Sequence, residues 1–336
     1  SWFDAPARPA GLYRITQGLH VATGLATIPL LVAKLWVVYP KLFRWPAFTS
    51  GAELIERVSL VPLIGGGIFQ LFTGFANINL WYPWPFNFRT SHYWVAWITI
   101  GALIVHIGAK YTVTRRALSR QDRVALVADD AQPVATDGSL DRRVFLSLVA
   151  GASGLVTLFT VGETVGPLRK LALLAPRRPD TGPQGFPVNR SAVAAGVVRS
   201  ARDPGYRLVV EGNVKRSLEF SLADLQRLPR HEATLPIACV EGWSTSRRWR
   251  GIRVRDLLAM AGAPHDAGVR VHSLQQRYGY ATSDLNPGQA ADPDTLLAVE
   301  VDGQELHIDH GYPLRLIGPN RPGVQQTKWV TRLVVT

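Results

Sequence analysis

The chain has 336 residues, a length that predicts about two domains at ~100–200 residues each. Hydrophobic residues make up 47% and charged residues 18% of the chain, which excludes a disordered or fibrous protein. The formal net charge is +12, and most of this excess lies before residue 180, in the more apolar half. Basic residues beside apolar segments favour a membrane surface over nucleic acid. A single cysteine excludes an intrachain disulfide and a CxxC metal site.

Four long apolar runs predict membrane-spanning helices in the first half of the chain. Each run approaches the ~20 residues that a helix needs to cross a bilayer. Aromatic residues gather near the ends of the runs, as expected at the level of the lipid headgroups. We therefore expect an all-α, four-helix transmembrane bundle over residues 1–174. The runs cover Ile15–Tyr39, Val58–Leu80, Tyr93–Ala109 and Val144–Gly162.

Basic residues predict the orientation of these helices. The second connection carries only Arg89, whereas the third carries Lys110, Arg115, Arg116, Arg120, Arg123, Arg142 and Arg143. The positive-inside rule therefore places the third connection in the cytoplasm. The stretch Asp141–Leu146 is similar to a twin-arginine export signal, although an ordinary pair of stop-transfer arginines would give the same pattern. We expect a multi-pass protein of the cell membrane with its C-terminal domain on the external (periplasmic or extracytoplasmic) side. By parity Ser1 also lies outside, which would fit an upstream helix.

The character of the sequence changes after residue 174. A linker over residues 175–184 contains Pro, Arg and Gly. Beyond it, short alternating runs predict strands, while residues 222–228 and 254–261 predict short helices. We expect an α+β domain over residues 185–336.

Three histidines, His20, His92 and His106, lie within or at the ends of the apolar runs. Ionisable side chains in a membrane are costly, so each is a functional candidate. A bound haem b needs two neutral imidazoles at one depth on neighbouring helices. Because the first and third helices run in the same direction, His20 and His92 share the outer side and are the predicted haem ligands. His106 lies about 21 Å deeper than His92 at 1.5 Å per residue, where it would bind a second haem or line a quinone pocket.

This histidine pattern and the short connections between helices resemble the membrane cytochrome b family over about residues 11 to 165. The resemblance implies haem b bound between the helices and electron exchange with quinone. Glycines at positions 65–67 and 74 leave room on the second helix, either for a porphyrin edge or for close helix packing.

The segment Leu235–Trp243 contains Cys239 and is followed by Trp249, Arg250 and Gly251. It resembles the molybdenum-ligating segment of the sulfite oxidase family of molybdopterin enzymes, most closely that of the catalytic subunit of the periplasmic protein methionine sulfoxide reductase. The resemblance implies a sulfite oxidase-like fold in which the Cys239 thiolate binds molybdenum beside the dithiolene sulfurs of one pterin. A soft thiolate suits such a metal. The alternative for a lone cysteine is a small buried apolar side chain.

Two further segments, residues 185–190 and 311–329, support this resemblance. It implies that Asn189 and Arg190 lie at the pterin. Because the pterin carries a phosphate, basic side chains are expected to converge on it. Arg315, Arg321 and Lys328 are the candidates, and a solvated surface charge is the alternative for each.

Residues 320–325 depart from the pattern of the nearest relatives, so the wall that faces the substrate is expected to differ. Glu241 and Arg247 lie near Cys239 in sequence and are candidate catalytic residues in contact with substrate. Ordinary ion pairs on the rim would explain them equally well. His307 and His310 precede Gly311 in a predicted turn, where a structural role is favoured.

Together the two halves predict a membrane-anchored, molybdopterin-dependent oxidoreductase with an external molybdenum site. It would transfer an oxo group, as an S-oxide reductase or a sulfite-type oxidase, and exchange electrons with the quinone pool through haem b. Its expected partners are a small-molecule substrate, quinone, membrane lipid and other membrane subunits. Nucleic acid is not expected, since the charges of the second half form no stripe with aromatics. The alternative is a non-catalytic electron-transfer or scaffold subunit of a larger respiratory membrane complex.

Overall fold

The computed structural model describes residues 5–43, 45, 51–118, 141–161, 166–175, 177–276 and 280–336. The chain divides into two compact units, Val21–Leu158 and a second unit that joins Ser1–His20 to Phe159–Thr336. The expected division placed residues 1–174 in one domain. The structure differs at the N-terminus, because residues 5–17 form hydrogen bonds with the C-terminal domain.

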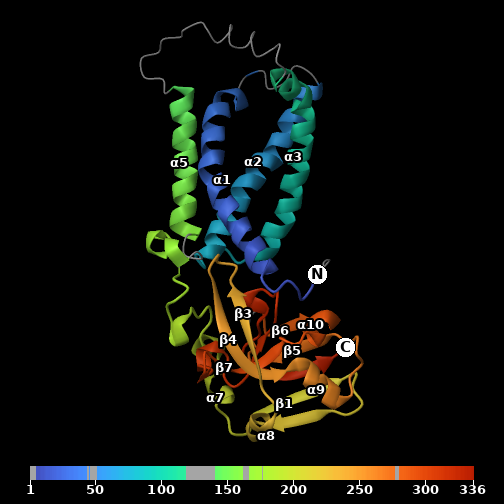
Figure 1. The fold of residues 1–336 in the computed structure, drawn as a ribbon. Helices are drawn as coiled ribbons and strands as arrows, with labels where there is room; N and C mark the ends of the chain where they lie inside the picture. Colours follow the sequence, from blue (N-terminus) through green and yellow to red (C-terminus); the bar gives the residue numbers. More distant parts are fainter. Residues whose placement is uncertain are drawn as a thin grey trace. The chain divides into compact units, whose positions relative to one another are not determined.

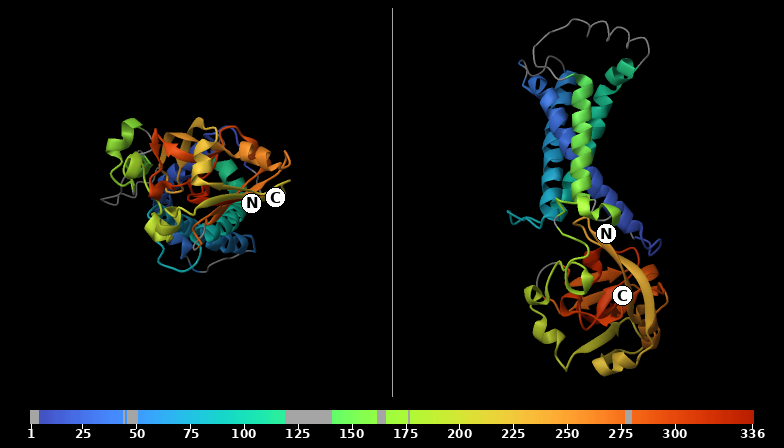
Figure 2. Two further views of the ribbon diagram at one scale, coloured as in Figure 1. Left: turned by 90° about the horizontal axis from the view of Figure 1, so that it is seen from below. Right: turned by 60° about the vertical axis from the view of Figure 1, so that its left-hand side comes forward.

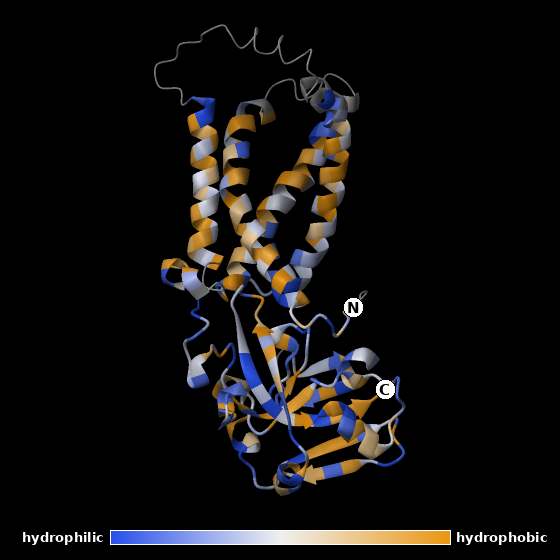
Figure 3. Ribbon diagram, in the orientation of Figure 1, coloured by the Kyte–Doolittle hydropathy of each residue, from blue (hydrophilic) through white to orange (hydrophobic). Residues whose placement is uncertain are grey.

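Four long helices occupy the first half of the chain (Figure 1): α1 (Leu12–Leu42), α2 (Gly51–Ile78), α3 (Phe88–Leu118) and α5 (Arg142–Val161). Within the described residues, each of the four is long and apolar enough to cross a membrane. Apolar side chains such as Trp36 and Ile104 are exposed on them, and Figure 3 shows hydrophobic residues along their whole length. Large exposed apolar surfaces mark sites that contact a membrane or another protein. The four predicted apolar helices are confirmed.

The helices α2 and α3 pack closely at a glycine. A Cβ added at Gly66 would collide with Thr99 Oγ1, so glycine lets the two helices approach without a shift of that side chain. An ion pair between Lys110 Nζ and Glu56 Oε1, 2.6 Å apart, joins the same two helices. Close helix packing therefore accounts for at least this part of the glycine-rich face.

The C-terminal domain contains two sheets (Figures 1 and 2). The first has the order β2-β1-β10-β5-β6, with β1 and β10 parallel and the other pairs antiparallel. The second has the order β3-β4-β7-β8, and β9 also pairs with β7. The strands are β1 (Arg207–Gly212), β2 (Leu218–Ser221), β3 (His231–Ala238), β4 (Ser244–Arg253), β5 (Val269–Ser273), β6 (Thr282–Leu285), β7 (Leu296–Val301), β8 (Gln304–Glu305), β9 (Arg315–Ile317) and β10 (Val330–Val335).

Short helices cover and connect the sheets. They are α6 (Ala192–Ala195), α7 (Val198–Ala201), α8 (Leu222–Arg227), α9 (Val254–Ala261) and α10 (Pro287–Ala291), with 3-10 turns at Gly166–Leu171, Pro183–Gly185, Ile308–His310 and Gly323–Gln325. The buried face of α9 carries Val254, Leu257, Leu258 and Ala261, which follow the helical period and pack into the core of the first sheet. The expected α+β domain is thus confirmed.

A second apolar cluster lies on the β3-β4-β7 sheet. Trp249 and Phe186 are fully buried in it, and Cys239 and Trp243 belong to the same cluster. The hairpin of β3 and β4 positions the cysteine, since its register pairs Ala238 with Ser244 and leaves the intervening residues as a tight connection.

Candidate active site

The connection Cys239–Trp243, which we call the cysteine loop, is a compact turn between β3 and β4. The Cys239 N–H donates to the Trp243 carbonyl at 2.9 Å, and the Gly242 N–H donates to the Cys239 carbonyl at 3.2 Å. Gly242 has a φ of +96°, which glycine adopts without steric cost. These bonds fix Cys239 at the end of a buried strand.

Cys239 is 1% exposed, and its sulfur has a polar neighbour. Asn189 Nδ2 donates to Cys239 Sγ at 2.9 Å, so the structure brings together two residues that were predicted at the cofactor. Burial, reinforced by the nearby Glu241 carboxylate, raises the pKa of the Cys239 thiol to about 12. Without a metal the residue is therefore a neutral thiol, and a bound cation would be needed to hold it as a thiolate.

Glu241 is a buried carboxyl two residues from the cysteine, with 2% of its surface exposed. Its Oε2 accepts a hydrogen bond from Trp243 Nε1 at 2.9 Å and lies 3.2 Å from Arg177 Nε. Burial raises the pKa of Glu241, while Arg177 and Trp243 act in the opposite direction. The other oxygen, Oε1, is buried and has no hydrogen-bond partner within the described part of the chain.

Arg177 was not among the predicted site residues. It belongs to the expected linker, residues 175–184, for which the sequence predicted no role in the site. Besides pairing with Glu241, it donates from Nη1 to the Val188 carbonyl at 2.7 Å. No local sequence signal links Arg177 to the cysteine loop, because the contact depends on the course of the linker over the domain.

Arg315 on β9 is a buried cation, 6% exposed. Its Nη1 donates to the His310 carbonyl at 3.0 Å, and its guanidinium carbon lies 5.6 Å from the centre of the Trp249 ring. Among the described residues it has no carboxylate within salt-bridge distance, and its Nε has no partner. Burial lowers the pKa of Arg315 to about 9.

Arg321 and Lys328 are also surrounded by carbonyl and amide groups. Arg321 donates to the Asp284 carbonyl at 2.9 Å, to Gln289 Oε1 at 2.7 Å and to the Gln325 carbonyl at 3.1 Å, and burial lowers its pKa to about 10. Lys328 Nζ donates to the carbonyls of Arg190 and Asp309 and lies 4.6 Å from the Trp329 ring centre. Burial places the pKa of Lys328 well below its ordinary value.

Gly311 allows Arg315 and Lys328 to converge. It has a φ of +117°, and an added Cβ would lie 3.1 Å from the Cβ atoms of both residues. His310, just before it, stacks on Phe186 with 3.6 Å between ring centres, and its Nε2 lies 2.7 Å from the Pro183 carbonyl. That contact requires a proton on Nε2 of a neutral ring, since burial lowers the pKa of His310 to about 3.

The contacts of Arg247 favour the ion-pair reading of this residue over the catalytic one. Its Nη1 lies 3.2 Å from Asp302 Oδ2, its Nη2 donates to the Gly185 carbonyl, and its guanidinium lies 5.3 Å from the Phe186 ring centre. These contacts join residues 185–186, at the start of the C-terminal domain, to the turn that follows β7. They provide no support for substrate contact.

The three histidines of the long apolar helices have different surroundings. His92 Nδ1 lies 2.9 Å from Thr73 Oγ1 on α2, and a Cβ at Gly74 would lie 3.7 Å from the His92 ring. His106 Nδ1 is buried with no hydrogen-bond partner in the described residues. His20 lies on α1 in the portion that belongs to the C-terminal unit.

The polar atoms of the C-terminal site fit an anionic cofactor. Buried Ser244 Oγ, Arg315 Nε and Arg321 Nε, all of them hydrogen-bond donors, have no partner among the described residues. Leaving such atoms unpaired costs free energy, and buried cations without carboxylates attract a negatively charged group. The residues present therefore fit a cofactor that combines a metal with a phosphate.

Comparison with known proteins agrees with this fit. Residues 195–336 match the family described as "Oxidoreductase molybdopterin binding domain". The sulfite oxidase of Gallus gallus is 33% identical over 167 residues, 41% of this chain and 36% of the relative. "Putative protein-methionine-sulfoxide reductase subunit YedZ1" of Azospira oryzae is 32% identical over 139 residues, 41% of this chain and 52% of the relative. "Uncharacterized oxidoreductase YuiH" of Bacillus subtilis is 30% identical over 132 residues, 39% of this chain and 65% of the relative.

The alignments thus span 36% to 65% of the length of these relatives. The family match covers both sheets of the C-terminal domain and includes the cysteine loop. Residues 195–336 thus match the family of oxidoreductase molybdopterin-binding domains and are similar to sulfite oxidases.

Proposed function

We propose that the protein is a membrane-anchored oxidoreductase that transfers an oxo group at the cysteine loop and exchanges electrons with quinone through haem b. The observation that carries this proposal is the buried Cys239, held by Asn189 in a molybdopterin-binding domain, on a chain with four helices of membrane-spanning length. The domain would lie on the external side of the membrane, as the charge pattern predicts. Quinone, lipid and other membrane subunits are the proposed partners.

Six residues would hold the cofactor. Cys239 supplies the thiolate for molybdenum, and the set that surrounds the pterin and its phosphate is Asn189, Arg190, Arg315, Arg321 and Lys328. When bound, the cofactor supplies two-electron oxo transfer to or from a small substrate such as an S-oxide or sulfite. The chain itself supplies buried positive charge that needs no reorganisation when the anionic group binds.

Glu241 is the proposed substrate-facing residue. Trp243 and Arg177 occupy one carboxylate oxygen, which fixes the orientation of the side chain. The second oxygen is left to accept a hydrogen bond from a substrate, or to take up a proton. Arg247, the other candidate catalytic residue, is bonded to Asp302 and the Gly185 carbonyl, and its buried Nε has no hydrogen-bond partner among the described residues.

His20 and His92 are the proposed haem ligands. The contact between Thr73 and His92 Nδ1 supports this role, since a hydrogen bond to one ring nitrogen orients the other toward a metal. His106, with its unpartnered Nδ1, is proposed either as a ligand of a second haem or as part of a quinone pocket.

The test is metal content and substrate turnover of the full chain purified in detergent. We expect about one molybdenum per chain, lost in Cys239→Ser while iron is retained, and iron lost in His92→Ala. His265→Ala is the matched control, because His265 is an exposed histidine of the C-terminal domain. Turnover is measured with methionine sulfoxide and a reduced quinone analogue, and separately with sulfite and an oxidised one. Wild-type protein with molybdenum but no iron would refute the haem proposal, and iron without molybdenum would refute the enzyme proposal.

A further inference from the structure

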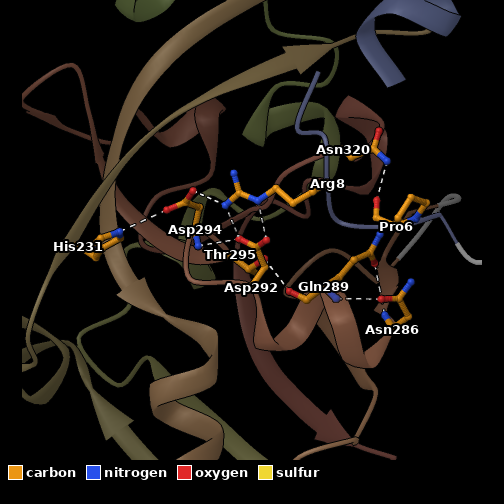
Figure 4. A network of polar contacts seen from close by, with 9 residues as sticks. All are labelled: Pro6, Arg8, His231, Asn286, Gln289, Asp292, Asp294, Thr295 and Asn320. Carbon is orange, nitrogen blue, oxygen red and sulfur yellow. Dashed lines mark hydrogen bonds and ion pairs between the residues drawn. The ribbon is translucent and has the colours of Figure 1, made fainter. Parts of the chain in front are cut away.

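The first described residues of the chain are bound to the C-terminal domain. Arg8 forms a two-pronged ion pair with Asp292, with Nε and Nη2 each 2.9 Å from a carboxylate oxygen (Figure 4). Its Nη2 also lies 2.5 Å from Asp294 Oδ2, and Asp294 is within 3.4 Å of His231 Nε2. The Asp292 side chain is 6% exposed, so this anchor is partly buried. Such paired geometry is stronger than a single surface contact.

Carboxamide side chains bind the backbone of the same segment. Asn286 Nδ2 and Gln289 Nε2 donate to the Ala5 carbonyl at 3.0 and 3.3 Å. Asn320 Nδ2 donates to the Pro6 carbonyl at 2.6 Å (Figure 4). Asn320 Oδ1 accepts from the N–H of Tyr13 at 2.7 Å. These contacts bind residues 5–17 to the C-terminal domain. We call residues 5–17 the N-terminal clamp.

The end of the clamp reaches the cysteine loop. Gln17 Nε2 donates to the Val240 carbonyl at 3.3 Å, and Val240 directly follows Cys239. Gln17 lies three residues before His20, so the two side chains share a face of α1 and are about 4.5 Å apart along its axis. One hydrogen bond and one helical turn therefore connect the residue after Cys239 with His20.

The segment that follows α5 contacts the cysteine loop at Glu241, the residue after Val240. Arg177, from the segment that follows α5, pairs with Glu241 at 3.2 Å. Both Gln17 and Arg177 lie outside residues 195–336, the part that matches the oxidoreductase domain family. Two residues outside the matched domain thus contact the cysteine loop: Gln17 on α1, and Arg177 from the segment that follows α5.

We propose that the N-terminal clamp is a positioning element, in which Arg8 anchors the segment and Gln17 holds the cysteine loop at a fixed separation from His20. The part that concerns His20 rests on the proposed function, because it assumes a haem there. The rate of electron exchange between the cofactor at Cys239 and a haem at His20 would depend steeply on their separation. A clamp that fixes this separation would favour exchange between the two groups of one chain.

Hydrogen exchange of the full-length holoenzyme tests the clamp. The reporters are the amides of Cys239 and Gly242, which are bonded within the loop. We expect about tenfold faster exchange at both in Arg8→Ala and Gln17→Ala, since one net hydrogen bond is removed from the support of the loop. Gln17→Glu keeps the size of the side chain but lacks the amide donor. It should therefore show the same faster exchange, and it covers the case in which the small alanine of Gln17→Ala perturbs folding.

Arg332→Ala is the matched control, since it removes another arginine–carboxylate pair, to Glu211, on the first sheet. Unchanged exchange at Cys239 and Gly242 in all three clamp variants would overturn the proposal. The electron paramagnetic resonance spectrum of the molybdenum centre is a second readout, and we expect it to change in Gln17→Glu and not in Arg332→Ala. If the protein contains no molybdenum or haem, the proposed function fails while the exchange measurement still decides whether the clamp holds the loop.

Discussion

Replacing Arg315 by methionine should have opposite effects on the protein with and without cofactor. The side chain is buried, has no carboxylate partner among the described residues and leaves its Nε unpaired. In the absence of an anionic ligand, this buried charge lowers the free energy of unfolding. With the ligand bound, the same charge contributes to affinity.

The size of the effect follows from the local contacts. Burial lowers the pKa of Arg315 from 12.5 to about 9, which at about 1.4 kcal/mol per pKa unit corresponds to about 5 kcal/mol against the buried charge. The bond to the His310 carbonyl and the contact with Trp249 offset about 3 kcal/mol of this. Methionine fills a similar volume, so Arg315→Met should stabilise the cofactor-free protein by about 2 kcal/mol.

Differential scanning calorimetry of the full chain in detergent measures this change. Protein from cells unable to make molybdopterin should melt about 4–8 °C higher in the variant, for a domain of this size. Protein from cofactor-producing cells should melt lower than wild type, because the stabilisation by bound cofactor is lost. Arg315→Lys keeps the charge and should show no gain without cofactor. A lower melting temperature of cofactor-free Arg315→Met would refute the view that this charge is held in place for a ligand.

Three further changes test other parts of the domain. The folded state keeps His310 neutral down to about pH 3, whereas the unfolded chain binds a proton near pH 6.5, so wild type should lose about 2 kcal/mol between neutral pH and pH 5. His310→Gln should lack this part of the pH dependence in melting curves, and an identical pH profile would contradict the assignment. Gly311→Ala should cost about 2 kcal/mol and reduce molybdenum content, because alanine is strained at a φ of +117° and its Cβ would crowd Arg315. Trp249→Ala should cost about 3–5 kcal/mol in denaturant unfolding, since this fully buried ring leaves a cavity, and a loss under 1 kcal/mol would show that the core there is loosely packed.

Much of the architecture could be predicted from local pattern. The four long helices followed from runs of apolar residues, because the length and composition of one segment suffice to mark a membrane-spanning helix. The helix α9 followed from its apolar period. The segment around Cys239 identified the cofactor class without any tertiary information, since the residues that carry the resemblance are nearly contiguous in the chain.

The arrangement around the cysteine could not be predicted in the same way. Glu241 was a candidate from its proximity in sequence, but its partner Arg177 lies in a segment that had no expected role in the site. Arg247 was a candidate for the same reason, and the structure directs it to Asp302 and the Gly185 carbonyl. On a strand, neighbours in sequence point to opposite faces, so closeness in the chain does not imply a shared site.

The N-terminal clamp shows most clearly what depends on the tertiary structure. In sequence, residues 5–17 lead into and begin the first long apolar helix, and Arg8 is one basic residue among many. In the structure Arg8 meets Asp292, and Gln17 meets the residue after Cys239. Helices and buried runs are encoded by neighbouring residues, whereas these pairings are fixed only when distant segments pack together. The sequence therefore determines the elements and the cofactor class, and the packing of distant segments decides which charges remain unpaired and which residues hold the cysteine loop.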